Sequence, residues 1–160
     1  YCKEEISMKE IRLDELLLDV RELILRAHPD YSVELVFSNA EADDDRLITT
    51  KGNPYLLNIA FANLIENNCK YSANHSSMVQ ISFTNEWSVV RMSDNGLGMS
   101  GQDKENLFKL FYRGNTEGSV EGHGIGMALA QKIISLHNGH IAVLSEQGKG
   151  TLFTVKLHHV

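Results

Sequence analysis

The chain has 160 residues, which is enough for one domain with a single sizeable core. Its hydrophobic content of 42% and charged content of 22% are ordinary for a globular protein, and its net charge of −6 argues against a general nucleic-acid binder, which needs a basic face to neutralise phosphates. Two cysteines without a CxxC pair predict reduced thiols in a cytoplasmic compartment, and the lack of an apolar run of about 18 residues predicts no membrane contact by this chain.

The first part of the chain carries helix and strand signals in turn. Residues 1–12 are polar and helical in propensity, and apolar residues at helical spacing predict a helix that begins at Leu13 and ends just before Pro29. Alternating apolar residues predict a strand over 32–38, and a shorter strand is expected at about 47–50.

A second helix has a well-marked start. Asn53 can cap it, Pro54 suits its first position, and we expect it to run to about Tyr71. The remaining expected elements are a hairpin over 78–83 and 87–93, a short helix near 103–110, a polar loop over 113–122, a helix over 124–137 and two strands over 140–146 and 151–157. Because the strands come largely in hairpins with helices between them, the sequence predicts an α+β two-layer sandwich, in which helices cover one face of a mixed, mostly antiparallel sheet.

Three polar residues lie on one side of the second helix. At about 100° per residue, Asn63, Asn67 and Lys70 fall within roughly 60° of one another. Amide oxygens can ligate Mg²⁺, and a lysine one turn further on can contact phosphate oxygens. The same pattern also fits a solvated polar face. Asparagine is a poor helix former, however, and the four asparagines of this helix cost stability, which invites a functional explanation.

Two further segments are candidate sites. Asp94 ends an apolar strand, where its carboxylate could accept a hydrogen bond from the exocyclic amine of adenine, and the glycines at 96 and 98 would let the backbone pass close to a flat base. Taken alone, this segment is better explained as a simple tight turn. Residues 122–126 open a helix whose backbone N–H groups can bind phosphate. Their third glycine comes one residue early for a dinucleotide-binding motif, and the polar loop before them favours a glycine-hinged lid.

In this order, the segments resemble the ATP-binding catalytic domain of two-component sensor histidine kinases, within the superfamily that includes gyrase, MutL and the large heat-shock chaperone. The matching segments are the N box at 63–71, the G1 box at 94–98, the F box at 107–113, the G2 box at 122–126 and the glycine-threonine element at 148–151. The resemblance covers about residues 13–157. It implies a Bergerat-type fold with ATP and Mg²⁺ as ligands.

The resemblance also implies a role for each matching residue. Asn63 and Asn67 would hold Mg²⁺ against the phosphates, Lys70 would contact phosphate, and Asp94 would read the adenine amine. The other implied ligand-binding residues are Tyr71 beside the nucleotide, Gly96 and Gly98 at the base, Gly122, His123, Gly124, Ile125 and Gly126 along the phosphates, Arg113 near the γ-phosphate, and Thr151 supporting Asp94 through water.

The sequence departs from the family pattern at three positions. Asn68 replaces the small residue usual after the second N-box asparagine, and Met127 stands where leucine is common; both are interpreted as tolerable packing changes. Asn63 replaces the glutamate that activates water in gyrase, MutL and the chaperone. Without that carboxylate, ATP can be kept for transfer to a protein histidine. Glu66 points off the ligand face and is not expected to take over the task.

No histidine of this chain lies in the context of a phosphoacceptor helix, so the acceptor must come from a separate dimerisation domain. Residues 1–12 are interpreted as the end of the connection from that domain, and residues 13–160 as the catalytic domain. The expected setting is the cytoplasmic part of a bacterial membrane-bound sensor, with a response regulator downstream and no nucleic-acid partner. Two alternatives remain open: an anti-sigma-type serine kinase with the same boxes, and a degenerate nucleotide-binding module that acts only in docking.

Overall fold

The structure is a computed structural model, and it describes most of the chain. The described residues are 7–37, 48–72, 74–84, 86–94, 123–146 and 150–159, with the side chains of 71, 123–126, 145 and 146 left out. The expected short helix near 103–110 and the loop over 113–122 therefore lie outside the described residues.

Single strands or pairs of strands are separated by helices along the described chain. The helices are α1 (Leu13–Ala27), α2 (Pro54–Tyr71) and α4 (His123–Leu136). The strands are β1 (Lys9–Arg12), β2 (Ser32–Phe37), β3 (Thr49–Gly52), β4 (Ser76–Phe83), β5 (Trp87–Ser93), β6 (His140–Glu146) and β7 (Gly150–His158).

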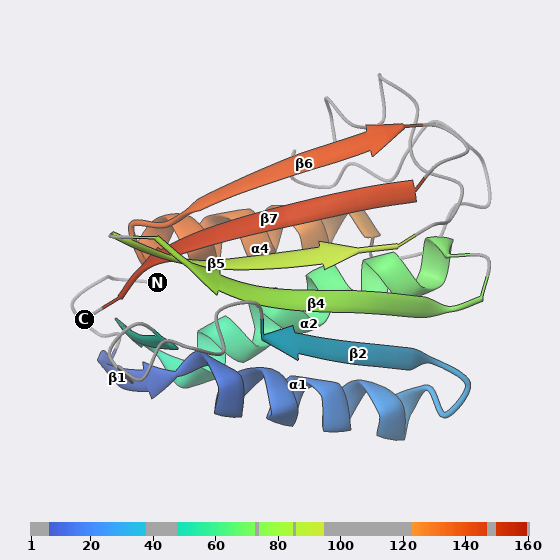
Figure 1. Cartoon of the computed structure of the whole chain (residues 1–160), viewed down its shortest axis with the longest axis horizontal. Coiled ribbons are helices and arrows are strands. Elements are labelled where there is room, and N and C mark those ends of the chain that lie inside the picture. Colours follow the sequence, from blue (N-terminus) through green and yellow to red (C-terminus); the bar gives the residue numbers. More distant parts are fainter. Residues whose placement is uncertain are drawn as a thin grey trace.

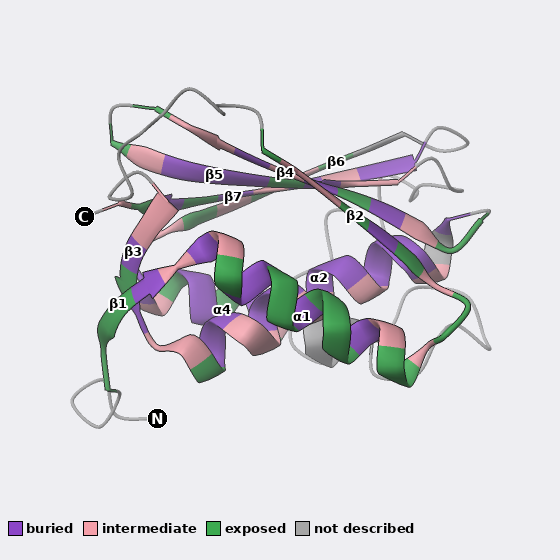
Figure 2. Ribbon diagram, turned by 60° about the horizontal axis from the view of Figure 1, so that its bottom comes forward, coloured by how far each residue is buried: buried purple, intermediate pink, exposed green. Residues whose placement is uncertain are grey.

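Five of the strands form one mixed sheet in the order β2-β4-β5-β7-β6. Only the β2–β4 pair of this sheet is parallel, and the other three pairs are antiparallel. Figure 1 shows the strands in front of α2 and α4, and Figure 2, turned from that view, shows the three helices together beneath the sheet. The predicted α+β sandwich with helices on one face is confirmed.

The N-terminal segment differs from its local helical propensity. Residues Lys9–Arg12 form strand β1, which pairs antiparallel with β3 and places Lys9 opposite Gly52. Ile11 within this strand is buried. Pairing with a segment some forty positions away in the chain therefore overrides local helix propensity. Strand β3 itself begins two positions later than the expected start at 47.

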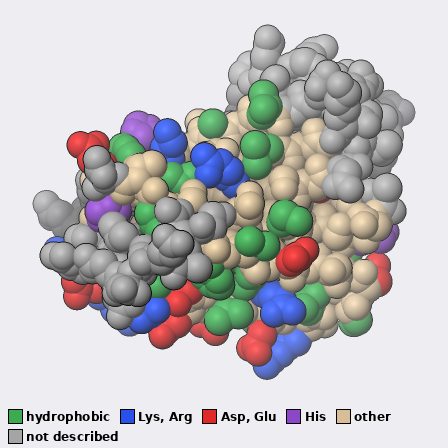
Figure 3. All heavy atoms as spheres, in the orientation of Figure 1, with side chains coloured by type: hydrophobic (Ala, Val, Ile, Leu, Met, Phe, Trp, Pro, Cys, Tyr) green, Lys and Arg blue, Asp and Glu red, His purple; other side chains and the backbone are tan. Residues whose placement is uncertain are grey.

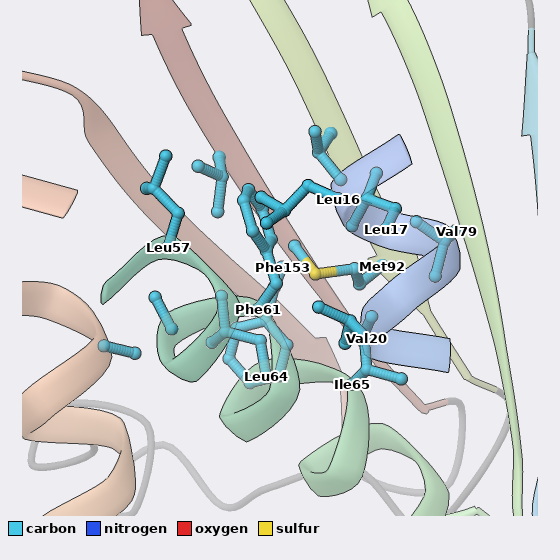
Figure 4. Close-up of a cluster of buried hydrophobic side chains, with 14 of the residues drawn as sticks. Leu16, Leu17, Val20, Leu57, Phe61, Leu64, Ile65, Val79, Met92 and Phe153 are labelled. Atoms are coloured by element: carbon cyan, nitrogen blue, oxygen red, sulfur yellow. The ribbon is translucent and has the colours of Figure 1, made fainter. Parts of the chain in front are cut away.

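The core lies between the sheet and the helices. In strand β7, residues 151, 153, 155 and 157 are buried while the alternate residues are more exposed, as expected for a sheet with one covered face. Figure 4 shows Phe61 and Leu64 of α2 beside Met92 of β5 and Phe153 of β7 in this layer. All four side chains are fully inaccessible.

Hydrogen bonds around Asn53 fix the start of α2. The Asn53 side chain accepts from the backbone N–H of Leu56 at 2.9 Å, which confirms the predicted cap. Its backbone N–H donates to Nε2 of His137 at 3.0 Å, and its amide donates to the carbonyl of Ser7 at 2.9 Å. Nε2 of His137 accepts from the backbone of Asn53, and Nδ1 of the same ring lies 2.7 Å from the carbonyl oxygen of Ile133, so this geometry assigns the ring proton to Nδ1.

The same contacts set the direction of α4 relative to α2. His137 directly follows α4 and contacts the start of α2, and a shallow apolar hollow is lined by Leu56 and Ile59 from α2 together with Ile133 and Leu136 from α4. The two helices therefore run antiparallel, as Figure 1 also shows. The last turns of α2 consequently lie at the same end of the molecule as the first turn of α4.

The open face of the sheet carries a mixed surface. Figure 3, in the orientation of Figure 1, shows basic and acidic side chains interspersed with hydrophobic ones over the described part of this face. Among the residues that the structure describes, no helix combines the length and the apolar character needed to cross a bilayer.

Gly139 offers a test of the packing between the end of α4 and the sheet. A Cβ at this position would lie 2.6 Å from the backbone carbonyl oxygen of Lys156 and 2.8 Å from Leu157 Cδ2. A backbone atom in a paired strand cannot move aside cheaply, so Gly139→Ala should lower the free energy of unfolding by about 1–3 kcal/mol. Urea denaturation measures the change. Ser135→Ala, on the exposed side of α4, is the control and should stay within about 0.5 kcal/mol of wild type.

Candidate functional site

Three polar residues lie at neighbouring strand ends on the covered side of the sheet. Each of them lies two positions from a fully buried apolar residue: Asp94 from Met92, Thr151 from Phe153 and Ser77 from Val79. Side chains alternate along a strand, so the polar residues face the helices as well. Ser77 precedes Met78, which pairs with Ser93, so Ser77 and Asp94 lie on adjacent strands at the same end.

The backbone of Asp94 is fixed to the neighbouring strand. Its N–H donates to the carbonyl oxygen of Thr151 at 3.0 Å, which continues the β5–β7 ladder one step past Ser93. Thr151 itself is 4% exposed. Family resemblance implied that Thr151 supports Asp94 through water, which stays a prediction, and the structure joins the two residues through this backbone hydrogen bond.

Helix α2 supplies a side-chain contact to Asp94 that the sequence interpretation missed. Asn68 donates from Nδ2 to Oδ2 of Asp94 at 2.8 Å and accepts at Oδ1 from the hydroxyl of Ser77 at 2.9 Å. Its side chain is fully inaccessible. The interpretation of Asn68 as a mere packing change is therefore wrong, because a buried amide of this kind connects two strands through hydrogen bonds.

A signal for this contact was present in the sequence. Asn68 lies four residues after Leu64 and seven after Phe61, so it continues the stripe of α2 that packs on the sheet. A polar side chain at a core position of an amphipathic helix needs a buried partner. Met127, the other departure from the family pattern, is 2% exposed within the core, as expected for a packing change.

The predicted magnesium and phosphate residues lie on the same stretch of α2. Asn67 is 4% exposed, whereas Asn63 and Lys70 are half-buried. Their spacing of four and three residues places them on adjacent turns of one helix side. Tyr71 ends the helix, and its side chain is not described.

The first turn of α4 contains several of the predicted phosphate ligands. Helix α4 begins at His123, so the backbone of Gly124, Ile125 and Gly126 belongs to its first turn. Unpaired N–H groups at a helix start can bind anions. The antiparallel packing brings this turn to the same end of the molecule as Lys70. The remaining predicted site residues, Gly96, Gly98, Arg113 and Gly122, lie outside the described residues.

Cys69 lies among these polar groups without being reactive itself. Its thiol is free and fully buried. Burial, followed by the negative charges of Asp94 and Glu66, raises the pKa of the Cys69 thiol to about 12. The thiol therefore stays protonated at neutral pH.

Comparison with known proteins identifies the family to which this fold and site belong. The family model described as "Histidine kinase-, DNA gyrase B-, and HSP90-like ATPase" matches residues 52–160. The chain belongs to this family. The match takes in α2, the sheet from β4 onward and α4, and so contains every contact around Asp94 described above.

Within this ATPase family, the chain is similar to the catalytic domains of sensor histidine kinases. It is 31% identical to the heme sensor protein HssS of Staphylococcus saprophyticus, over 100% of this chain and 39% of that protein. It is 33% identical to the sensor histidine kinase RppB of Synechocystis, over 91% of this chain and 31% of that protein. The chain thus spans only 31–39% of the length of these two relatives.

Solved structures show the same fold. The mycobacterial sensor histidine kinase MprB superposes with a TM-score of 0.77 at 20% identity, covering 94% of this chain and 98% of that one. At this identity the likeness concerns the fold. It agrees with the α+β architecture found here and with helices on one face of the sheet.

The high pKa of Cys69 gives this ATPase-family domain a testable chemical property. In a Cys2→Ser background, Cys69 is the only thiol of the chain. Its alkylation by iodoacetamide at pH 8 should be slower in the native protein than in urea, by on the order of a hundredfold or more. The reason is that the thiolate is the nucleophile, and the raised pKa keeps the native thiol protonated. Mass spectrometry of timed samples gives both rates. Equal rates would contradict the buried, protonated thiol.

The same shift has a consequence for stability. The pKa of the Cys69 thiol in the folded state lies above its ordinary value of 9.0, so the contribution of this group to stability is complete below about pH 9 and is lost as the pH rises toward about 12. Urea denaturation across this range should show the loss, and a Cys69→Ala variant should show a smaller one.

Proposed function

We propose that this chain binds ATP with Mg²⁺ and donates the γ-phosphate to a histidine on a separate dimerisation domain, in a two-component pathway with a response regulator downstream. The observation that carries the proposal is the fixed carboxylate of Asp94. Its backbone is bonded to β7 and its side chain to α2, at the end of the molecule where the polar turns of α2 and the start of α4 also lie.

The adenine side of the proposed site depends on this fixed acceptor. An ionised carboxylate accepts hydrogen bonds and donates none, so Asp94 suits the exocyclic amine of adenine and repels the carbonyl oxygen of guanine. A charged acceptor also makes the stronger hydrogen bond. The glycines at 96 and 98 would complete the base-binding surface.

The phosphate side of the proposed site combines amide oxygens, a cation and a helix start. Asn63 and Asn67 offer the hard oxygen donors that Mg²⁺ prefers, and Lys70 offers a positive charge one turn later. Mg²⁺, when bound, would neutralise phosphate charge. Backbone N–H groups of the first turn of α4, from His123 to Gly126, would bind the phosphates, with Gly122 and Arg113 as further proposed contacts.

This residue set favours transfer over hydrolysis. Phosphoryl transfer needs mainly positioning and charge neutralisation, which the proposed site supplies. Asn63 cannot take a proton from water as a glutamate could, so water attack is unassisted at that position. The nucleophile is then a histidine ring nitrogen from another domain, and the serine-kinase alternative predicts a hydroxyl in its place.

The surroundings of the site fit a domain within a longer sensor. The matched segment makes up 39% and 31% of the length of the two relatives, and residues 1–12 would connect residues 13–160 to the dimerisation helices. ATP is available in the cytoplasm, where we place this domain. The bond from Asn53 to Ser7 would then join the connection directly to the start of α2.

Phosphotransfer in trans tests the proposal. The chain alone should bind ATP, hydrolyse it very slowly and take up no label from γ-labelled ATP. Adding the dimerisation helices of the same kinase should produce acid-labile phosphate on their histidine, which gel autoradiography with and without acid treatment detects. Acid-stable label would indicate a hydroxyl acceptor and reject the histidine-kinase assignment, and a failure to bind ATP would indicate a docking module.

Asn67→Ala tests the metal side of the site. The loss of an amide ligand should weaken ATP binding at least tenfold in the presence of Mg²⁺, or about 1.4 kcal/mol, and far less in EDTA. Titration calorimetry under both conditions measures the difference. Asn58→Ala, the same change two to three turns earlier in α2, is the matched control and should leave both affinities unchanged. Equal losses with and without metal would assign Asn67 a structural role.

A further inference from the structure

Asn68 is a buried side chain that donates a hydrogen bond to the proposed adenine-reading carboxylate. The contact joins Nδ2 of Asn68 to Oδ2 of Asp94 at 2.8 Å. Asn68 stands where the family usually has a small residue, and a small side chain could not reach Asp94 from this position. The hydrogen bond is therefore a feature of this chain rather than of the family pattern.

The orientation of the Asn68 amide follows from its partners. Ser77 donates its hydroxyl proton to Oδ1 of Asn68 at 2.9 Å, and an ionised Asp94 can only accept. If the amide were turned over, its oxygen would face the carboxylate oxygen, so that both groups would present acceptors to each other. The chain of donors thus runs in one direction, from Ser77 through Asn68 to Asp94.

The chain of hydrogen bonds is buried at Ser77 and Asn68 and half-buried at Asp94. Asn68 is fully inaccessible and Ser77 is 3% exposed. Ser77 lies at the end of β4, an inner strand that is paired on both sides, with β2 and with β5. A hydrogen bond shielded from water competes with fewer alternative partners, so it holds the carboxylate in one orientation more firmly than an exposed bond would.

From this geometry we propose that Asn68 is a positioning residue for nucleotide recognition: with Ser77 behind it, it fixes the rotation of the Asp94 carboxylate so that the carboxylate meets the 6-amino group of adenine. The inference rests on the proposed function, since it assumes that Asp94 reads adenine. It adds that selectivity for adenine in this chain depends on a residue that does not touch the nucleotide. Removal of this bond would leave the carboxylate less firmly oriented, and ordering it on binding would then weaken the affinity for ATP.

Binding of ATP and of purine riboside triphosphate tests the inference, because the second nucleotide is ATP without the 6-amino group. Calorimetry with Mg²⁺ should show wild type preferring ATP. Asn68→Ala should weaken ATP binding on the order of tenfold, as expected for a misplaced charged hydrogen bond. The same variant should change the affinity for purine riboside triphosphate less than about twofold. That nucleotide has no 6-amino group, so it makes no hydrogen bond to Asp94 that the substitution could weaken.

Two further variants keep the test independent of folding. Ser77→Ala leaves Asn68 in place but removes its support, and it should weaken ATP binding by a few-fold with no effect on the analogue. Asn58→Ala is the matched control in the same helix and should bind both nucleotides as wild type does. Thermal unfolding of each variant shows whether it is folded under the binding conditions.

A double-mutant cycle with Asp94→Asn measures the coupling directly. If Asn68 acts through Asp94, then Asp94→Asn should weaken ATP binding much less in the Asn68→Ala background than in wild type. Additive losses would overturn the inference, as would an Asn68→Ala variant that loses both nucleotides equally or loses neither. If the wild-type protein still binds ATP more tightly than purine riboside triphosphate in those cases, the proposed function is not contradicted. A wild type that does not distinguish the two nucleotides would overturn both.

Discussion

The burial of helix α2 against the sheet is the interaction on which the rest of the structure depends. Phe61 and Leu64 pack with Met92 and Phe153 in a layer that excludes water. The same helix stripe, one turn further on, presents Asn68 to the strand ends. Because the two stretches belong to one rigid helix, the packing that stabilises the core also sets the distance between the amide and Asp94. The site therefore takes its precision from the core.

The core and the candidate site share the same helix-facing side of the sheet and differ in the chemistry of their side chains. Towards the middle of the sheet the helix-facing residues are apolar, and at the strand ends they become Ser77, Asp94 and Thr151. A polar group beside a core costs free energy unless it is hydrogen-bonded. Among the described residues, every buried side-chain nitrogen and oxygen has a partner. This arrangement lets a charged residue stand next to an apolar layer without loosening it.

The sequence predicted those features that depend on neighbouring residues. The bounds of α1 and α2 followed from apolar spacing, a capping asparagine and prolines, which act within a few positions. Strand β1 could not be predicted in this way, because its state depends on pairing with β3 across the length of α1 and β2. Asn68 was misread for a related reason. A family pattern records which residue is usual at a position, whereas the role of this amide depends on a serine and an aspartate from two different strands.

Strand β7 is the last strand along the chain, yet it lies between β5 and β6. A ribosome releases the chain from its N-terminal side at about 5–20 residues per second, so β2, β4 and β5 can pair before residues 150–158 have emerged. Until then the inner edge of β5 exposes backbone groups that could pair with another nascent chain. Insertion of β7 closes this edge and, in the same step, brings Thr151 to Asp94. Pairing of β7 thus protects the sheet edge and completes the backbone contact of Asp94 in one step.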